Sequence, residues 1–361
     1  MHRITRVLLV LGLLMIAVSS QSVASVNASA SACPQGGCSL YLPVTQTAGK
    51  LLKIGLVTDV SGIDDKSFNQ SAWQGVLDAE TNLGITGAYI ESESQDDYTP
   101  NIESFISQGY DLIITVGFTM SDATKAAAQA HPTQKFSIVD SAYDPILSNV
   151  MGQIYSSEQA AFLCGYLAAG TTTTGKVATF GGMNISPVTQ FMNGYFQGVT
   201  YYNQENGTSV QVLGWDPVTG TGEFTNNFTD PAAGFAMGQK LIGLGADIVF
   251  PVAGPTGLGA AQAVQEQGGS WVIGVDTDWT LTAPEYTSVI LTSAMKHPRA
   301  TTYGVLNLTY HNHFAGGNYV GTLTNQGVGL GTISSSVPPA LLATVEQVKA
   351  GIIGGTIIVT P

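Results

Sequence analysis

From Lys53 onward, short apolar runs alternate with segments whose apolar residues recur at helical spacing. The run at residues 53–58 (KIGLVT) is followed by Phe68, Ala72, Val76 and Ala79, which lie three or four residues apart, as on one face of a helix. The same alternation continues to about residue 293. The expected strands are 53–58, 87–90, 111–116, 135–139, 176–180, 210–213, 246–251, 271–275 and 289–293. The expected helices are 68–79, 101–108, 121–130, 158–169, 187–199, 233–244 and 258–267.

Continuous apolar strands separated by helices are typical of parallel sheets that are covered by helices on both faces. Two such runs, with a break near residue 155, predict two doubly wound α/β domains. The segment 158–169 is apolar nearly all round, which predicts a helix buried near the crossover between the domains. Ligands of doubly wound sheets bind beyond the carboxyl ends of the strands. The residues that directly follow each strand are therefore the candidates for a binding site.

Acidic, aromatic and glycine residues recur at these positions. They are found at 59–69, 117–119, 140–141, 181–183, 253–257, Asp276 and Lys296. Carboxylates accept hydrogen bonds from hydroxyl groups, aromatic rings stack on flat rings, and glycine lets backbone N–H groups come close. This combination indicates an uncharged, polyhydroxylated ligand with a flat ring. Each aspartate alone also fits a helix N-cap; the recurrence at strand ends is what favours a ligand site.

Charge narrows the class of partner. The 361 residues include 12 basic and 25 acidic side chains, which gives a net charge of −13. An acidic chain repels phosphate backbones, so we expect no nucleic-acid polymer as a partner. The 43 glycines follow no Gly-X-Y period and indicate many tight turns between strands and helices.

The first thirty residues resemble a secretory signal peptide. Arg3 and Arg6 precede an apolar run at 7–18, and small residues follow at 19–31. We therefore expect residues 1–30 to be removed and 31–50 to form a tether; an uncleaved anchor is the alternative. Cys33 and Cys38 could form a disulfide in an oxidising compartment, or Cys33 could carry a lipid, and the sequence leaves this open.

Other motifs are weaker. The spacing Gly254-x-x-Gly257-x-Gly259 departs from a dinucleotide-binding loop and indicates a plain strand-to-helix turn. His311 and His313 have no Cys or Glu nearby in the sequence, so we expect them to be surface residues rather than metal ligands. The acidic residues at 91–97 lack the spacing of a calcium loop and predict a solvated turn. The sequence contains no nucleophile elbow, P-loop or HExxH motif, so we expect no catalytic activity, no metal and no cofactor.

Many of the strand-end residues lie in motifs similar to those of the BMP family, the basic membrane protein and PnrA-like substrate-binding proteins of nucleoside ABC importers. The most specific is GLVTD at 55–59 with GIDDKSFNQSAW at 62–73. Further similar segments lie at 97–101, 109–118, 162–169, 181–183, 227–231, 245–247, 253–257 and 274–278. The resemblance covers nearly all of residues 53–300, and the last sixty residues match only loosely.

The resemblance implies a type I periplasmic-binding-protein fold, in which two doubly wound parallel-sheet lobes are joined by a hinge of three crossovers. On this basis lobe 1 comprises residues 51–155 plus about 279–312. Lobe 2 comprises 156–278 plus about 313–361.

The resemblance also implies a function. The protein would be exported to the periplasm or the outer face of the plasma membrane, bind a purine nucleoside between its lobes as a monomer, and deliver it to an ABC permease. Asp59, Asn69 and Asp140 would form hydrogen bonds with the ligand, and Phe68 would stack on the base. The remaining implied contacts are a second ring from Phe228, the backbone of Gly254, and ribose hydroxyls on Asp276 and Lys296.

Two alternatives to a nucleoside carrier are a receptor for another flat ligand, such as a flavin or modified nucleoside, and a nucleoside-processing enzyme. One residue departs from the family pattern: Trp279 follows Asp278 where many members carry Gln. An indole beside the sugar would alter the choice of ligand.

Overall fold

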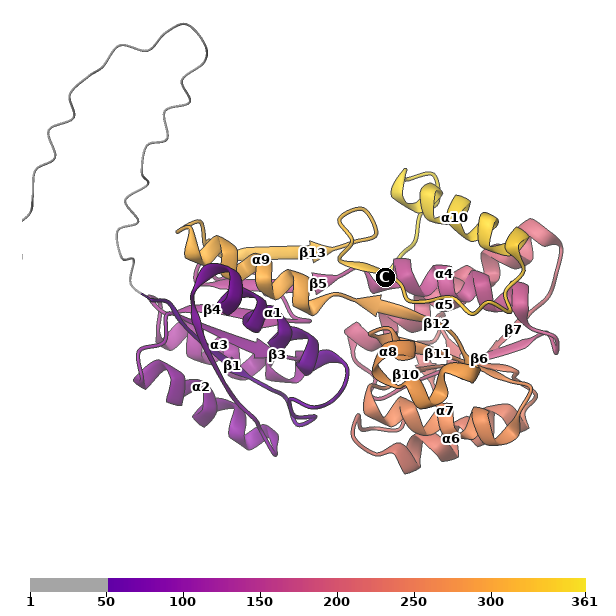
Figure 1. The fold of residues 1–361 in the computed structure, drawn as a ribbon, viewed down its shortest axis with the longest axis horizontal. Coiled ribbons are helices and arrows are strands. Elements are labelled where there is room, and N and C mark those ends of the chain that lie inside the picture. The colour runs from indigo at the N-terminus through magenta and orange to yellow at the C-terminus, as the bar shows by residue number, and fades with distance from the viewer. Residues whose placement is uncertain (1–50) are drawn as a thin grey trace, which may run out of the picture. The chain divides into compact units, whose positions relative to one another are not determined.

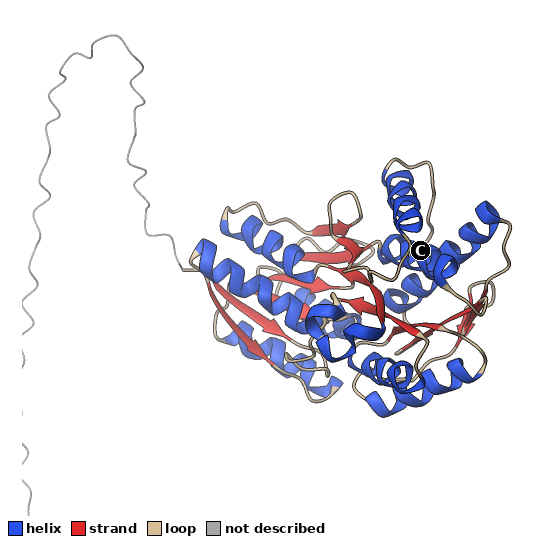
Figure 2. Cartoon of the chain, turned by 45° about the vertical axis from the view of Figure 1, so that its right-hand side comes forward, coloured by secondary structure: helices blue, strands red, loops and turns tan. Residues whose placement is uncertain are grey.

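In the computed structural model, which describes residues 51–361, the chain forms two lobes, each built on a twisted sheet (Figures 1 and 2). The predicted signal peptide, tether, Cys33 and Cys38 lie outside the described residues. The first sheet has the strand order β13 (Gly317–Gly321), β5 (Val150–Tyr155), β4 (Lys135–Val139), β3 (Leu112–Val116), β1 (Lys53–Val57) and β2 (Thr86–Ile90). The second has the order β14 (Val328–Leu330), β12 (Ile290–Lys296), β11 (Trp271–Asp276), β10 (Ile248–Val252), β6 (Lys176–Gly181) and β7 (Gln211–Leu213).

Neighbouring strands are parallel in both sheets, except that β14 runs antiparallel to β12. The strands of the first sheet are covered by α1 (Phe68–Leu83), α2 (Tyr98–Ser107), α3 (Ser121–Ala130) and α9 (Pro298–Tyr310). The second lobe contains α4 (Ser157–Thr171), α5 (Ser186–Asn206), α6 (Pro231–Gly243), α7 (Pro255–Gln267), α8 (Trp279–Thr282) and α10 (Pro339–Ile353). Short 3-10 turns at Gln95–Asp97, Phe118–Met120 and Pro284–Val289, and a small hairpin of β8 (Trp215–Asp216) and β9 (Thr221–Gly222), complete the described elements.

Helix pairs cover the sheets. In the first lobe α1 packs on α9 and α2 on α3, and in the second α4 packs on α5 and α6 on α7. Central strands such as β3 are buried along their whole length, as their continuous apolar sequences predict. The predicted α/β class with parallel sheets is thus confirmed.

The chain crosses between the sheets three times. It passes from β5 to α4, from β12 to α9, and from β13 to β14. The first crossing lies where the sequence predicted it, but the later boundaries differ. The strand at 290–296 was expected in lobe 1 and pairs with β11 of the second sheet, whereas 317–321 was expected in lobe 2 and pairs with β5. A short strand can pair in either sheet, so its sequence does not say which sheet it joins.

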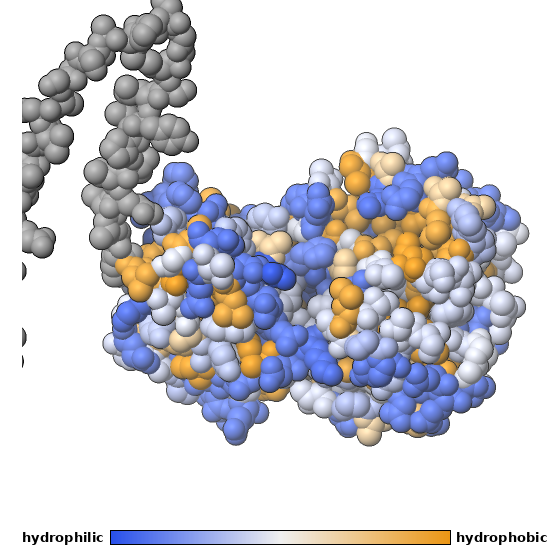
Figure 3. Space-filling model, in the orientation of Figure 1, coloured by the Kyte–Doolittle hydropathy of each residue, from blue (hydrophilic) through white to orange (hydrophobic). Residues whose placement is uncertain are grey.

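Helix α4 is buried on nearly every side, as predicted from its apolar sequence. It contacts α5, α10, β12 and β14. Apolar residues also gather on the surface beside α10 (Figure 3). Within residues 51–361, no helix combines the length and apolar character that a membrane span requires.

Close packing of α4 on α5 depends on glycines at the contact. A Cβ added to Gly198 would collide with the backbone carbonyl of Phe162, and one added to Gly194 would collide with the backbone of Glu158. The two helix backbones therefore approach more closely than any larger residue would allow.

We expect Gly198→Ala to lower the free energy of unfolding by ~1–3 kcal/mol, because the new methyl group must push the helices apart. Gly304, in α9, is a matched control, since a Cβ there meets nothing within 4 Å. Gly304→Ala should raise the stability by ~0.5–1 kcal/mol through helix propensity. Urea denaturation measures both, and wild-type stability of the Gly198 variant would contradict this account of the contact.

Candidate functional site

One cavity lies between the carboxyl ends of the strands of the two sheets. The empty space inside it, including open solvent at its mouth, is about 620 Å³. Its walls include all eight site residues predicted from the sequence: Asp59, Phe68, Asn69, Asp140, Phe228, Gly254, Asp276 and Lys296. The structure thus brings together residues that are up to 237 positions apart, from Asp59 to Lys296.

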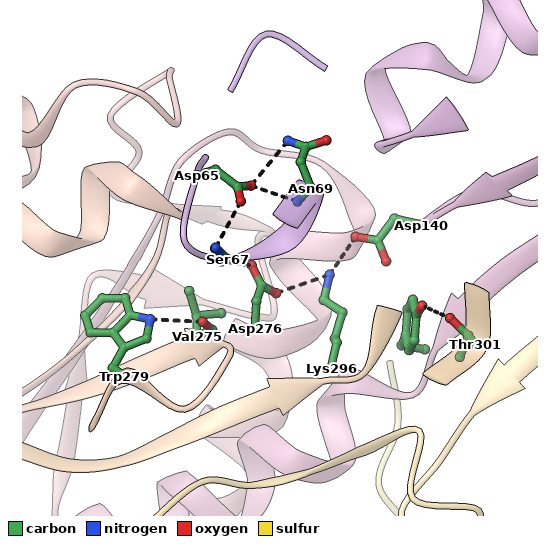
Figure 4. Close-up of polar contacts among 10 residues, drawn as sticks. Asp65, Ser67, Asn69, Asp140, Val275, Asp276, Trp279, Lys296 and Thr301 are labelled. Atoms are coloured by element: carbon green, nitrogen blue, oxygen red, sulfur yellow. Dashed lines mark hydrogen bonds and ion pairs between the residues drawn. The ribbon is translucent and has the colours of Figure 1, made fainter. Parts of the chain in front are cut away.

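Lys296 lies at the centre of the polar contacts (Figure 4). It is the last residue of β12, and its side chain is 5 % exposed. Its Nζ lies 2.6 Å from Asp140 Oδ2 and 3.5 Å from Asp276 Oδ1. Burial would lower the pKa of Lys296, but the two carboxylates more than offset this and raise it, so the ammonium form is retained. Burial raises the pKa of Asp140, although Lys296 acts in the opposite direction.

Asp140 and Asp276 occupy corresponding places in the two lobes. Asp140 follows β4 and Asp276 ends β11, which are the third strands in the order of their sheets. Both have a backbone φ of 65°, which lies in the left-handed region that residues other than glycine, asparagine and aspartate rarely adopt. This turn directs both carboxylates at Lys296, one from each lobe.

A second polar group surrounds the start of α1. Asn69 donates from Nδ2 to Asp59 Oδ1 at 2.8 Å and to Asp65 Oδ2 at 3.2 Å. Its Oδ1 is buried and has no partner, so it could accept a hydrogen bond from a ligand. Burial raises the pKa of Asp59, although hydrogen bonds from Asn69 and Ser61 lower it.

Asp65 holds this arrangement in place. Its carboxylate accepts hydrogen bonds from the backbone N–H groups of Ser67 (2.9 Å), Asn69 (2.8 Å) and Gln70 (3.1 Å), and thereby caps the first turn of α1. Sequence reasoning placed Asp65 in the family motif but gave it no role. An aspartate a few residues before a predicted helix is the signal that could have found it.

Aromatic rings enter the cavity from both lobes. Phe68 comes from α1 of the first lobe and Phe228 from the loop before α6 of the second. A Cβ at Gly182 would collide with the Phe228 ring, so glycine is required where this ring packs. Lys296 Nζ lies 5.0 Å from the centroid of Phe68 and 5.2 Å from that of Phe191, within cation–π range. Phe191 lies in the predicted helix at 187–199 and had no predicted role in the site.

The lobes also contact each other directly beside Lys296. Ser67 Oγ donates to Asp276 Oδ2 at 3.3 Å, and Thr277 Oγ1 donates to the carbonyl of Lys66 at 3.4 Å. These contacts join the loop before α1 to the loop after β11. Ser67 also lines the cavity and was not singled out from the sequence.

Trp279 is not beside the ligand cavity, contrary to the expectation from sequence. It is 2 % exposed, packs over Gly274 and Gly257, and donates from Nε1 to the carbonyl of Val275 at 3.1 Å. The indole therefore packs against the strand that ends at Asp276 and is hydrogen-bonded to its backbone (Figure 4). The departure from the family pattern is accommodated in the core.

The structure also shows where the glycine motif, the two histidines and the buried cysteine lie. Gly254, with φ of 51°, precedes α7 and forms a strand-to-helix turn, as predicted. His311 and His313 are exposed. Among the described residues no group of three His, Cys, Asp or Glu side chains could hold a metal ion. Cys164 is buried, which raises the pKa of its thiol.

Comparison with known proteins identifies the family. The model of the family described as "ABC transporter substrate-binding protein PnrA-like" matches residues 52–360. The chain belongs to this family. The predicted family is confirmed, and with it the prediction of a substrate-binding protein rather than an enzyme.

Similar proteins support this assignment. The "ABC transporter nucleoside-binding protein BmpA" of Lactococcus lactis is 33 % identical, over 95 % of this chain and 98 % of that protein. "Basic membrane protein A" of Borreliella burgdorferi is 33 % identical, over 76 % of this chain and 78 % of that protein. A crystal structure of an ABC transporter solute-binding protein from Aeropyrum pernix K1 has a TM-score of 0.76 at 26 % identity, covering 86 % of this chain and 94 % of that one.

The stability of the fold should depend on pH through Asp65. Burial raises its pKa from 3.8 to about 6, and hydrogen bonds from the first turn of α1 only partly oppose this. The folded state thus binds more protons than the unfolded state between about pH 4 and 6, so this group's contribution to stability is present below pH 4 and is lost as the pH rises to 6.

Asp65→Asn should remove this part of the pH dependence, because asparagine does not titrate there. Urea denaturation of both proteins at pH 4, 5, 6 and 7 gives the measurement, with the difference between them growing most from pH 4 to 6. Asp122→Asn, at an exposed position in α3, serves as a control for the loss of one carboxyl group. Parallel curves for the wild type and the Asp65 variant would rule out this role.

Proposed function

We propose that this protein captures a purine nucleoside between its two lobes, outside the cytoplasm and as a monomer, and delivers it to an ABC permease. The observation that carries the proposal is the cavity with one phenylalanine from each lobe and Lys296 between two aspartates. A relative that is 33 % identical over nearly its whole length is named a nucleoside-binding protein. The signal-peptide pattern at residues 1–30 supports export.

The two halves of the cavity suit the two halves of a nucleoside. Phe68 and Phe228 would stack on the base, and the free Oδ1 of Asn69 would accept a hydrogen bond from a ring N–H or amino group. Asp59, held by Asn69 and the backbone of Ser61, offers its second oxygen to the same edge. A base with donors on its hydrogen-bonding edge satisfies these acceptors, and the larger purine ring offers more stacking area.

Asp276 and Lys296 would hold the ribose, with Asp140 beside them. Hydroxyl groups both donate and accept, so they fit between carboxylates and an ammonium group. Contacts to both lobes would stabilise the closed arrangement, because a ligand shifts a conformational equilibrium by its differential affinity for the two states. Gly254, which lines the cavity, would add its backbone to these contacts.

The Asp276 contact can be tested with a variant that preserves the backbone. Asparagine tolerates φ of 65°, whereas alanine would add strain at this position. We expect Asp276→Asn to weaken guanosine or inosine binding about 10- to 150-fold, the cost of losing a charged hydrogen bond of ~1.5–3 kcal/mol. Titration calorimetry measures this, with Asp122→Asn as the control and thermal melting as the check on folding. Unchanged affinity would remove Asp276 from the site.

The stacking roles are tested separately. We expect Phe68→Leu and Phe228→Leu each to reduce purine-nucleoside affinity about 5- to 150-fold, since stacking contributes ~1–3 kcal/mol per base face. Tyr89→Leu, in the exposed part of β2, is a control for loss of an aromatic ring. A thermal-shift screen of purine and pyrimidine nucleosides, sugars and riboflavin should show the largest shift with purine nucleosides. A larger shift with riboflavin would support the flat-ligand alternative instead.

A further inference from the structure

A second cavity adjoins the nucleoside cavity and has a different chemistry. It encloses about 910 Å³, counting solvent at its mouth, and shares Phe118, Asp140 and Pro187 with the first cavity. Its other walls come from both lobes: Ser141 and Tyr155 from the first, and Glu158, Ser186 and Gln190 from the second. The two cavities therefore meet at the wall that carries Asp140.

The second cavity is acidic. Asp140 and Glu158 line it, and no Lys, Arg or His is among the residues of 51–361 that do so. Glu158 is 5 % exposed, and its Oε2 is buried without a hydrogen-bond partner. Burial raises the pKa of Glu158, although the Ser156 side chain and the backbone N–H of Glu158 itself donate to the carboxyl group. Asp140 is already paired with Lys296, so among the described residues Glu158 is the lining side-chain carboxyl group without a counterion. Since a buried carboxylate without a counterion is costly, a cation beside Glu158 would be stabilised.

The second cavity lies next to the residues that are proposed to hold the ribose. Under the proposed function, on which this step rests, Asp276 and Lys296 hold the ribose diol. Asp140 contacts Lys296 and forms the wall between the cavities. With the base and the diol held in the first cavity, the remaining substituent of the ribose ring is its 5′ carbon. This carbon would then face the second cavity.

We propose that the second cavity is a subsite for a positively charged substituent on the 5′ carbon of the nucleoside, such as an ammonium group. Glu158 provides the charge that selects it. The same charge repels a 5′ phosphate, so the site discriminates against nucleotides. Ser141, Ser186 and Gln190 supply neutral hydrogen-bonding groups around the substituent.

The test compares adenosine, 5′-amino-5′-deoxyadenosine and adenosine 5′-monophosphate by titration calorimetry at pH 7. We expect the amine to bind about tenfold more tightly than adenosine, and the monophosphate at least about 100-fold more weakly. In Glu158→Gln the ratio of amine to adenosine affinity should fall to about two or less. Equal binding of amine and adenosine by the wild type would overturn the subsite and leave the nucleoside proposal standing; failure of both to bind would overturn both proposals.

A second variant keeps the test decisive if Glu158→Gln does not fold. Gln190 is half-buried and lines only the second cavity of the two. Gln190→Lys places an ammonium group there, so it should abolish the preference for the amine and strengthen monophosphate binding about tenfold or more. If Gln190→Lys leaves the ratios among the three ligands as in the wild type, the second cavity does not receive the 5′ substituent.

Discussion

A buried ammonium group must have anionic partners, because an isolated charge inside a protein costs several kcal/mol. For Lys296 those partners come from both lobes, Asp140 from the first and Asp276 from the second. The constraint thus fixes more than one side chain. Both aspartates adopt a left-handed backbone to reach the ammonium group, and the turn after β11 that positions Asp276 is supported by the buried indole of Trp279. The chemistry of the cavity and the approach of the lobes depend on the same contact.

This arrangement explains how binding could be coupled to movement. The chain crosses between the sheets three times, and these crossings provide a hinge of covalent connections near the site. Polar contacts such as Lys296 with Asp140 and Ser67 with Asp276 also join the lobes. Under the proposed function, these polar groups would contact water when the lobes open and ligand hydroxyls when they close. The ligand would then set the balance between the open and closed forms.

Much of this could be predicted from sequence because strand ends are easily located. Apolar runs such as 112–116 mark central strands, and the polar residues after them converge at one edge of a parallel sheet. Strand β5 was missed for a physical reason: Gln153 interrupts its apolar pattern, yet is buried because Ser137 and Thr301 satisfy its side chain at 2.9 and 2.5 Å. Such partners, 16 and 148 residues away, leave no local signal. The lobes predicted for β12 and β13 were wrong for a similar reason, because strand pairing depends on tertiary contacts that the local sequence does not specify.

The site also shows how two lobes of one topology can acquire different chemistry. β5 and β12 occupy the same place in their sheets, and they end in Tyr155 and Lys296 respectively. Two lysines there would bring two ammonium groups together between the lobes. Instead the Tyr155 ring lies 5.8 Å from Lys296 Nζ and presents an aromatic group to the cation, while its hydroxyl is hydrogen-bonded to Thr301. The lobes can therefore share a fold and paired aspartates, yet only one of them supplies a cation at this point of the cavity.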